Sequence, residues 1–284
     1  MGVSTLMRNV HFKTVSLIVT TYNQEAHLSL VLDSILHLVI FPNEVLIADD
    51  GSEQSTALLI KSYVSSFKQK GISLKHIWQE DLGFRVAKSR NNAILEARGE
   101  YIVIIDTDTI LSPLFIYDHL YFAHPKVLLQ GGRIFLTQQE SQKILNQRDL
   151  SLTHSKRSYK NYRNLALAYL VYKCHQITRR IFQKKTMIKG VRSANMSFSK
   201  KDFLAIDGFN ENFVGWGRED SEFVARFLFN QGVMKVLKFC AITYHVCHKE
   251  NKRDLLQENH ARYLQTLQKQ RISWREPKTL SYPS

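Results

Sequence analysis

Two aspartates separated by one threonine, Asp106-Thr107-Asp108, directly follow an apolar run at residues 101–105. The run has the length and β-branched content of a buried strand. If the extended geometry continues through the tripeptide, both carboxylates lie on one side. They repel each other unless a cation binds, and oxygen ligands suit Mg²⁺ or Mn²⁺ better than zinc. The pattern predicts a metal-diphosphate site; the alternative is a solvated turn in which a carboxylate hydrogen-bonds backbone.

A second acidic pair, Asp49-Asp50, follows another strand-like run at residues 44–48. A carboxylate at this position could accept the imide N–H of a uracil ring. The alternative is a capped turn, because Asp-Gly-Ser is a common turn sequence.

Three basic residues lie just before or within the first turns of a helix expected at residues 86–98: Arg85, Lys88 and Arg90. Basic side chains and free backbone N–H groups at a helix start can bind a diphosphate. The alternative is solvated surface charge.

The stretch GWGRED places Trp216 between two glycines and puts Glu219 and Asp220 at a helix start. An aromatic ring in a flexible loop suits the apolar face of a sugar, and one of the carboxylates could act as a general base. The alternative is that both only complement the helix dipole. Farther along the chain, His245 and His248 could supply a further metal ligand, although a single histidine is more often structural.

Strand-like and helix-like patterns alternate between residues 15 and 105. Strands are expected at residues 15–20, 44–48, 73–78 and 100–105, and helices at 25–37, around 58–67 and at 86–98. This order predicts an α/β fold with a mostly parallel sheet, helices on both faces and ligands at the carboxyl ends of the strands. The polar cluster Thr20-Thr21-Tyr22-Asn23 and both acidic pairs fall at that edge.

The pattern loosens beyond residue 133. Residues 150–189 resemble a basic amphipathic helical insert around the apolar run 165–172, suited to an anionic membrane surface or to lying solvated on the main domain. Ser112 is expected to cap a helix that opens with Pro113, and Ser199 to cap a short helix that ends at Gly208.

A late strand is expected at residues 236–246 and a helical tail at 251–284. The expected division is a domain of residues 1–250 and this tail. Within the domain, the expected parts are residues 1–132, the insert at 150–189 and residues 190–250.

The 284 residues carry 39 Lys+Arg against 25 Asp+Glu, a formal net charge of +14, which predicts anionic partners. Three cysteines, without C-x-x-C spacing, argue against a disulfide framework or zinc knuckle and favour a reducing cytoplasm. The six-residue apolar run after Lys13 is too short for a signal-peptide core or a membrane span. We therefore expect a cytoplasmic protein, with peripheral attachment to the inner face of the membrane through the insert.

Five stretches, VSLIVTTYN, IADDGS, GFRVAKSRNNAI, GEYIVIIDTD and GFNENFVGWGRED, occur in the order and approximate spacing of glycosyltransferase family 2. The chain resembles these inverting sugar-nucleotide transferases of GT-A fold over about residues 14–250. The late block also resembles the C-terminal segment of the β-1,4-galactosyltransferases and of bacterial chondroitin-type polymerases. The resemblance implies that residues 1–132 bind the nucleotide sugar and that 190–250 form the acceptor and catalytic half. The insert matches no family motif.

The resemblance implies a metal-dependent transferase with Mn²⁺ or Mg²⁺ and a nucleotide diphosphate sugar, usually a UDP-sugar. It implies Asp220 as the base, Glu219 near the sugars, and a metal held by Asp106, Asp108 and His245, with His245 preferred over His248. The expected donor-binding residues are Thr20, Thr21, Tyr22, Asn23, Asp49, Asp50, Arg85, Lys88, Arg90, Asn91, Asp106, Thr107 and Trp216.

The expected function is hexosyl or N-acetylhexosaminyl transfer to a hydroxyl of a cell-envelope polysaccharide, lipopolysaccharide or lipid-linked glycan. A sugar-nucleotide-forming nucleotidyltransferase is an alternative, but it should carry a glycine-rich loop after the first strand, and TTYNQEAH has no glycine. A nucleic-acid-binding protein needs basic residues interleaved with aromatics, for which only the Tyr159/Tyr162 region is a short candidate. We expect no nucleic-acid partner.

Overall fold

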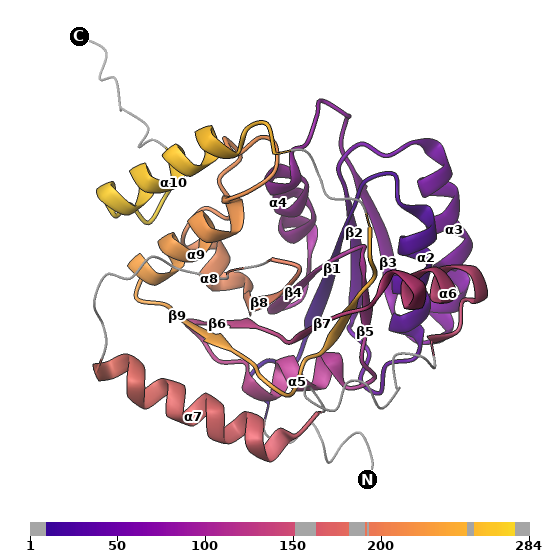
Figure 1. Cartoon of the computed structure of the whole chain (residues 1–284), viewed down its shortest axis with the longest axis horizontal. Coiled ribbons are helices and arrows are strands. Elements are labelled where there is room, and N and C mark those ends of the chain that lie inside the picture. Colours follow the sequence, from indigo (N-terminus) through magenta and orange to yellow (C-terminus); the bar gives the residue numbers. More distant parts are fainter. Residues whose placement is uncertain (1–9, 151–162, 182–190, 192, 249–252, 276–284) are drawn as a thin grey trace.

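The computed structural model describes residues 10–150, 163–181, 191, 193–248 and 253–275, and a twisted central sheet organises them (Figure 1). Its seven strands have the order β3-β2-β1-β4-β8-β6-β9, and only β8 runs antiparallel to its neighbours. The strands are β1 Val15–Thr21, β2 Glu44–Asp49, β3 Ser73–Trp78, β4 Tyr101–Asp106, β6 Val127–Gln130, β8 Asn195–Ser199 and β9 Val233–Val236. The predicted α/β fold with a mostly parallel sheet is confirmed.

Successive residues of the central strands enter two different cores, because side chains alternate across a sheet. Leu17 and Val19 of β1 face one core, and Ile18 between them faces the other. The first core is covered by helices α2 Glu25–Leu36, α3 Gln54–Gln69 and α5 Phe115–Phe122, and the second by α4 Val86–Glu96, α8 Lys200–Leu204 and α9 Glu219–Phe229. Burial on both faces explains why these strands read as continuous apolar runs.

A smaller sheet of three strands crosses the front of the carboxyl edge in Figure 1, in the order β5 Thr109–Leu111, β10 Thr243–His245, β7 Arg133–Phe135. The single late strand predicted over residues 236–246 is wrong. The chain leaves the large sheet after β9, passes through left-handed backbone at Phe239 (φ 65°) and Ala241 (φ 48°), and enters the small sheet as β10. Two such residues cannot belong to a regular strand.

Helix starts were predicted with mixed success. Ser199 caps α8 as expected, since its side chain accepts a hydrogen bond from the backbone N–H of Asp202. The Ser112-Pro113 start is wrong: α5 begins at Phe115 after the N-cap residue Leu114. The short helix α8 ends at Leu204, before Gly208.

Two further helices, one in the insert and one in the tail, lie in predicted helical regions, and a third, before the insert, was not predicted. Helix α7 Leu165–Ile181 lies within the predicted insert, whereas residues 151–162, including the Tyr159/Tyr162 region, and residues 182–189 lie outside the described residues. In the tail, α10 Leu256–Lys269 packs on α9. Helix α6 Gln138–Gln147, with its Thr137 capping box, was missed. None of the helices in the described ranges is long and apolar enough to cross a membrane.

Candidate active site

A cavity of about 720 Å³ opens at the carboxyl edge of β1 and β4 and extends to the start of α9. It brings together most of the residues singled out from the sequence. Those that line it are Thr20, Thr21, Tyr22, Asp50, Arg90, Asp106, Thr107, Asp108, Trp216, Glu219, Asp220 and His248. Parallel pairing explains the convergence, since β1 lies between β2 and β4 and sets Thr20 beside Asp106 and Thr21 beside Asp49.

Asp50 is the member of its acidic pair that faces the cavity. Its two carboxylate oxygens accept hydrogen bonds from Gln79 Nε2 at 2.6 Å and from the backbone N–H of Arg85 at 2.7 Å. Burial raises the pKa of Asp50, and the Arg85 N–H acts against that shift. The carboxylate is therefore held in a fixed orientation with acceptor capacity left for a ligand.

The other candidates for donor binding lie outside the lining of this cavity: Asn23, Asp49, Arg85, Lys88 and Asn91. Asp49 is fully buried and hydrogen-bonds His76 Nε2 at 2.7 Å. Asn91 is also buried, and its amide bonds both backbone groups of Phe209 at 2.8 Å. The side chains of Asp49 and Asn91 thus contact the protein itself and hold the segments that frame the cavity.

The Asp-Thr-Asp tripeptide does not continue the strand. β4 ends at Asp106, and Thr107 and Asp108 form a turn into β5. The two carboxylates consequently have different partners: Asp106 Oδ1 accepts from Arg90 Nη2 at 2.9 Å, whereas Asp108 contacts His245 and His248. The premise that both carboxylates extend to one side is wrong, although both line the cavity.

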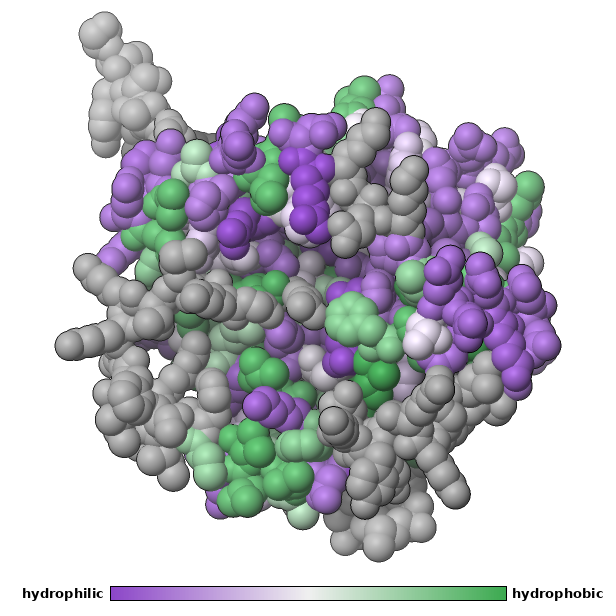
Figure 2. All heavy atoms as spheres, viewed as in Figure 1, coloured by the Kyte–Doolittle hydropathy of each residue, from purple (hydrophilic) through white to green (hydrophobic). Residues whose placement is uncertain are grey.

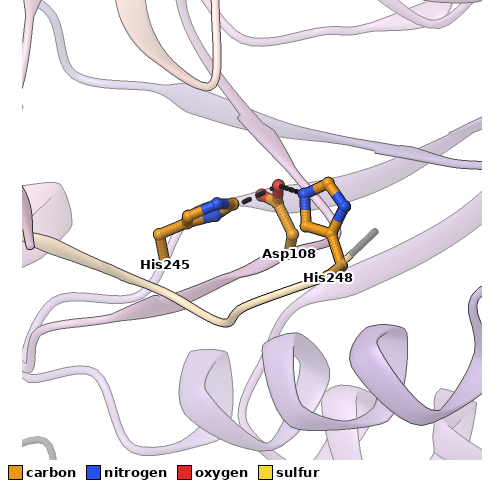
Figure 3. Close-up of side chains that lie close together, drawn as sticks. All are labelled: Asp108, His245 and His248. Carbon is orange, nitrogen blue, oxygen red and sulfur yellow. Dashed lines mark hydrogen bonds and ion pairs between the residues drawn. The ribbon is translucent and has the colours of Figure 1, made fainter. Parts of the chain in front are cut away.

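Asp108, His245 and His248 form the cluster that could hold a metal ion (Figure 3). Asp108 Oδ2 lies 3.1 Å from His245 Nδ1 and 2.8 Å from His248 Nε2, and the three candidate ligand atoms are within 4.8 Å of one another. Antiparallel pairing of β10 with β5 sets His245 opposite Thr109, next to Asp108. The sequence analysis preferred His245 to His248 as a metal ligand. In the structure both imidazoles contact the same carboxylate oxygen, Asp108 Oδ2.

The donor set of this cluster fits a divalent cation. Burial acts to raise the pKa of Asp108, but hydrogen bonds from the two histidines hold it below its usual range. Asp108 Oδ1 is buried without a hydrogen-bond partner in the described part of the chain. A carboxylate with two imidazoles suits a transition ion such as Mn²⁺ better than Mg²⁺, which prefers oxygen ligands. Asp106, predicted as a metal ligand, is not part of this cluster.

Arg133 was missed from the sequence, and it lies against the same cluster. Its Nη2 lies 2.5 Å from His245 Nδ1 and 3.6 Å from Asp108 Oδ2. Parallel pairing of β7 with β10 sets Arg133 beside Thr243, two residues before His245. No local motif marks this arginine, because its position depends on the pairing of strands more than 100 residues apart along the chain.

Arg90 connects the two ends of the cavity. Its buried guanidinium bonds Asp106 at 2.9 Å through Nη2 and lies 3.5 Å from Glu219 Oε1 through Nη1. Burial opposes the charge, but Asp106 and Glu219 outweigh it and raise the pKa of Arg90. The end of β4 and the start of α9 are therefore joined through one cation.

Glu219 and Asp220 occupy the first turn of α9 and face different partners. Glu219 faces Arg90, and its Oε2 is buried with no hydrogen-bond partner among the described residues. Asp220 Oδ1 accepts from the backbone N–H of Ser221 at 2.6 Å. Burial and then the charge of Asp220 raise the pKa of Glu219 to about 7. Burial also raises the pKa of Asp220, with the Arg90 charge acting against that rise.

A buried ion pair fixes the helix that carries these two carboxylates. Arg226 of α9 is fully buried, bonds Glu222 at 2.8 Å, and donates to the backbone carbonyls of Ile206 and Gly208. Removing one partner of such a pair typically costs about 3–5 kcal/mol, because an unpaired charge is left in the interior. The position of the first turn of α9 is thus tied to the loop before it.

Trp216 stands on a loop that needs two glycines. Gly215 (φ 76°) and Gly217 (φ 107°) have left-handed backbone, which other residues rarely adopt. The indole is 37% exposed, lines the cavity, and lies 4.9 Å from the guanidinium of Arg253. A half-exposed ring at this place is available to a sugar face.

Several lining residues were not among the candidates chosen from the sequence. They include Gln24, Phe84, Val191, Ser193, Arg218 and Leu256. Ser193 and Leu256 come from segments distant from the motifs, so only the folded chain brings them to the site.

Glu219→Gln is expected to stabilise the fold at pH 8 by several degrees in the thermal midpoint. The folded-state pKa of Glu219 is raised to about 7 from an ordinary value of 4.5, so the unfolded chain ionises first. The wild type therefore loses stability as pH rises through this window, and the loss is complete above about 7. Glutamine removes that loss. Thermal melts at pH 5 and pH 8 test this expectation, and an equal difference between variant and wild type at both pH values would contradict it.

The arrangement of this site and sheet defines the class of the protein. The crystal structure of S. aureus TarS 1-349 in complex with UDP-GlcNAc matches with a TM-score of 0.55 at 19% identity, over 84% of this chain and 60% of that one. Mannosyltransferase PcManGT from Pyrobaculum calidifontis, in complex with GDP-Man and Mn²⁺, matches with a TM-score of 0.56 at 17% identity, over 91% of this chain and 66% of that one. The fold is the GT-A fold of glycosyltransferases.

The chain belongs to glycosyltransferase family 2, whose profile, described as Glycosyl transferase family 2, matches residues 16–185. A second profile, described as the N-terminal domain of galactosyltransferase, matches residues 175–249. The resemblance inferred from the motifs is confirmed, including that of the late block.

Curated relatives include two polysaccharide synthases. Chondroitin synthase of Escherichia coli is 26% identical over 252 residues, which cover 84% of this chain and 36% of the relative. Hyaluronan synthase of Pasteurella multocida is 27% identical over 229 residues, which cover 76% of this chain and 23% of the relative. The chain thus spans well under half the length of either protein.

Proposed function

We propose that the chain transfers a hexosyl or N-acetylhexosaminyl group from a UDP-sugar to a hydroxyl of a growing polysaccharide or lipid-linked glycan, with inversion at the anomeric carbon. The main observation in support of this proposal is that Asp50, Asp108 and the Glu219-Asp220 pair line one cavity at the carboxyl edge of a GT-A sheet. A relative named chondroitin synthase and a structural neighbour bound to UDP-GlcNAc support this choice.

The binding step is assigned to residues at the strand ends. Asp50, oriented by Gln79 and the Arg85 N–H, accepts the imide N–H of the uracil ring. Trp216 offers its exposed ring to the transferred sugar. A divalent cation held by Asp108, His245 and His248 would offset the charge that grows on the leaving diphosphate. Since two ligands are imidazoles, we propose Mn²⁺ over Mg²⁺.

The chemical step is assigned to Asp220. Its carboxylate takes the proton from the acceptor hydroxyl while the acceptor oxygen bonds to the anomeric carbon and the bond from that carbon to the diphosphate oxygen breaks. UDP leaves, and a single displacement inverts the configuration. Arg90 pairs with Asp106 through Nη2 and with Glu219 through Nη1, whereas the neighbouring Asp220 takes part in none of the ion pairs of the described residues.

Release of UDP from a panel of UDP-sugars, with Mn²⁺, with Mg²⁺ and with a chelator, tests this function. We expect release from at least one UDP-sugar with Mn²⁺, weaker release with Mg²⁺, and none with chelator. Formation of pyrophosphate from UTP and a sugar phosphate would instead indicate the nucleotidyltransferase alternative. A shift of DNA or RNA in a gel, without any release of UDP, would indicate a nucleic-acid-binding protein.

The insert supports a peripheral membrane contact as part of this proposal. Helix α7 exposes Leu167, Tyr169 and Leu170, with Lys173 over the ring of Tyr169. Figure 2 shows hydrophobic side chains gathered where the first half of α7 lies in Figure 1. An exposed apolar patch on a chain of formal charge +14 suits a surface of anionic lipid.

Co-sedimentation with phosphatidylserine vesicles is expected at low salt and is expected to weaken at high salt. The double variant Leu167→Gln, Leu170→Gln should bind less without loss of folding, because both side chains are exposed. Equal sedimentation of this variant, or no sedimentation of the wild type, would leave α7 as a solvated helix.

A further inference from the structure

A second cavity, of about 430 Å³, lies beside the first at the same edge of the sheet. It occupies the carboxyl ends of β6 and β9 and the start of the antiparallel strand β8. Arg133 and Ala194 line both cavities and form their common wall. None of the functions assigned above uses this space.

The second cavity is positively charged. Arg133 and Lys238 line it, and no lining residue is a carboxylate. Arg133 already faces Asp108 at 3.6 Å, so part of its charge is offset. Lys238 is exposed and takes part in none of the ion pairs within the described residues. An anion that enters this cavity therefore meets Lys238 as the available cation.

The walls of the cavity suit a sugar ring. Gln130 lies beside apolar side chains such as Ile134 and Ile242. Asn195 also lines the cavity, but its amide is buried and donates to the backbone carbonyls of Gly132 and Ala241, so it shapes the wall. At Gly132, an added Cβ would lie 3.3 Å from the carbonyl oxygen of Cys240 and 3.7 Å from Ile242, so the backbone packs closely along this wall. Apolar walls with a few polar groups are typical of small-molecule sites.

The cavity begins next to the proposed base. Ala194 of the common wall follows Ser193, whose backbone N–H hydrogen-bonds Asp220. An acceptor whose hydroxyl lies at Asp220 can therefore place its next sugar residue past Ala194. The donor does not need this space, because the strand ends that would bind its nucleotide line the other cavity.

We propose that the second cavity binds an anionic sugar residue of the acceptor, whose carboxylate or phosphate group contacts Lys238 and Arg133. This inference rests on the proposed function and adds to it the charge class of the acceptor. The two anionic groups share the chemistry that a lysine and an arginine recognise, namely paired oxygens carrying negative charge.

Calorimetric titration of the full chain, with UDP and Mn²⁺ present at saturation, tests the proposal. The probes are methyl β-D-glucuronoside, glucose 6-phosphate and the neutral methyl β-D-glucoside. We expect at least one anionic probe to bind about tenfold more tightly than the glucoside, in line with one charge-assisted contact. The stronger of the two anionic probes identifies the group as carboxylate or phosphate.

Lys238→Glu should abolish this preference, because it reverses the available charge. The matched control is Lys61→Glu, an exposed lysine of α3 outside both cavities, which makes the same change in net charge and should keep the preference. Equal binding of charged and neutral probes, no binding of any probe, or a preference that survives in Lys238→Glu would overturn the proposal. Metal-dependent UDP binding and donor hydrolysis, measured on the same samples, report separately on the proposed function.

Discussion

Replacing Asp220 with asparagine is expected to reduce turnover by about 10²-fold or more while leaving the affinity for UDP nearly unchanged. Asparagine keeps the size and the hydrogen bond from the Ser221 N–H, but it cannot take a proton from the acceptor hydroxyl. Single-turnover rates and UDP titrations on the same preparation separate the chemical step from binding.

Glu219→Gln is the matched comparison, because it makes the same chemical change one residue away. Glu219 faces Arg90, so this variant should act more on substrate binding than on turnover. If Asp220→Asn kept near-normal turnover and Glu219→Gln lost it, the two roles would have to be exchanged. If both variants stayed active, the base would lie outside this helix start.

Asp108→Asn is expected to remove metal-dependent UDP binding without unfolding the chain. The carboxylate is the common partner of His245 and His248, and an amide is a poor ligand for a divalent cation. Calorimetric titration of UDP with and without Mn²⁺ measures the effect, and thermal melts check the fold.

Asp106→Asn is the informative control, because the two aspartates have different partners. Asp106 contacts Arg90 and is absent from the histidine cluster, so its variant should keep the Mn²⁺ dependence of UDP binding even where overall affinity falls. Loss of Mn²⁺ dependence in Asp106→Asn would return this residue to the metal site, and retention of it in Asp108→Asn would remove the Asp-His-His cluster from the proposal.

The first half of the fold was predictable from sequence because its elements are local. The strand over residues 73–78 and the helix starts at Glu25 and Val86 were predicted at their observed positions. A strand buried on both faces is a continuous apolar run, and a helix on its surface shows a 3.6-residue period. Parallel pairing then collects the strand ends at one edge, which explains why Asp50, Asp106 and Asp108 were rightly grouped.

The rest depended on contacts that no local pattern records. The sequence analysis assumed extended backbone through Asp108. The chain instead turns after Asp106, and this turn sets the direction of the Asp108 side chain. The pairing of His248 with that carboxylate, and the approach of Arg133, follow from the small sheet β5-β10-β7, whose strands are only three residues long. Strands this short carry too few residues to show a period.

The small sheet also has a consequence for how the protein is made. Its middle strand, β10, is the latest of the described strands in the chain, and it brings His245 to a carboxylate 137 positions earlier. During synthesis from the amino terminus, β1 to β4 can pair while Thr243 has not yet left the ribosome. The nucleotide-facing edge can therefore form well before the cation cluster, and a nascent chain remains without that cluster until β10 inserts between β5 and β7.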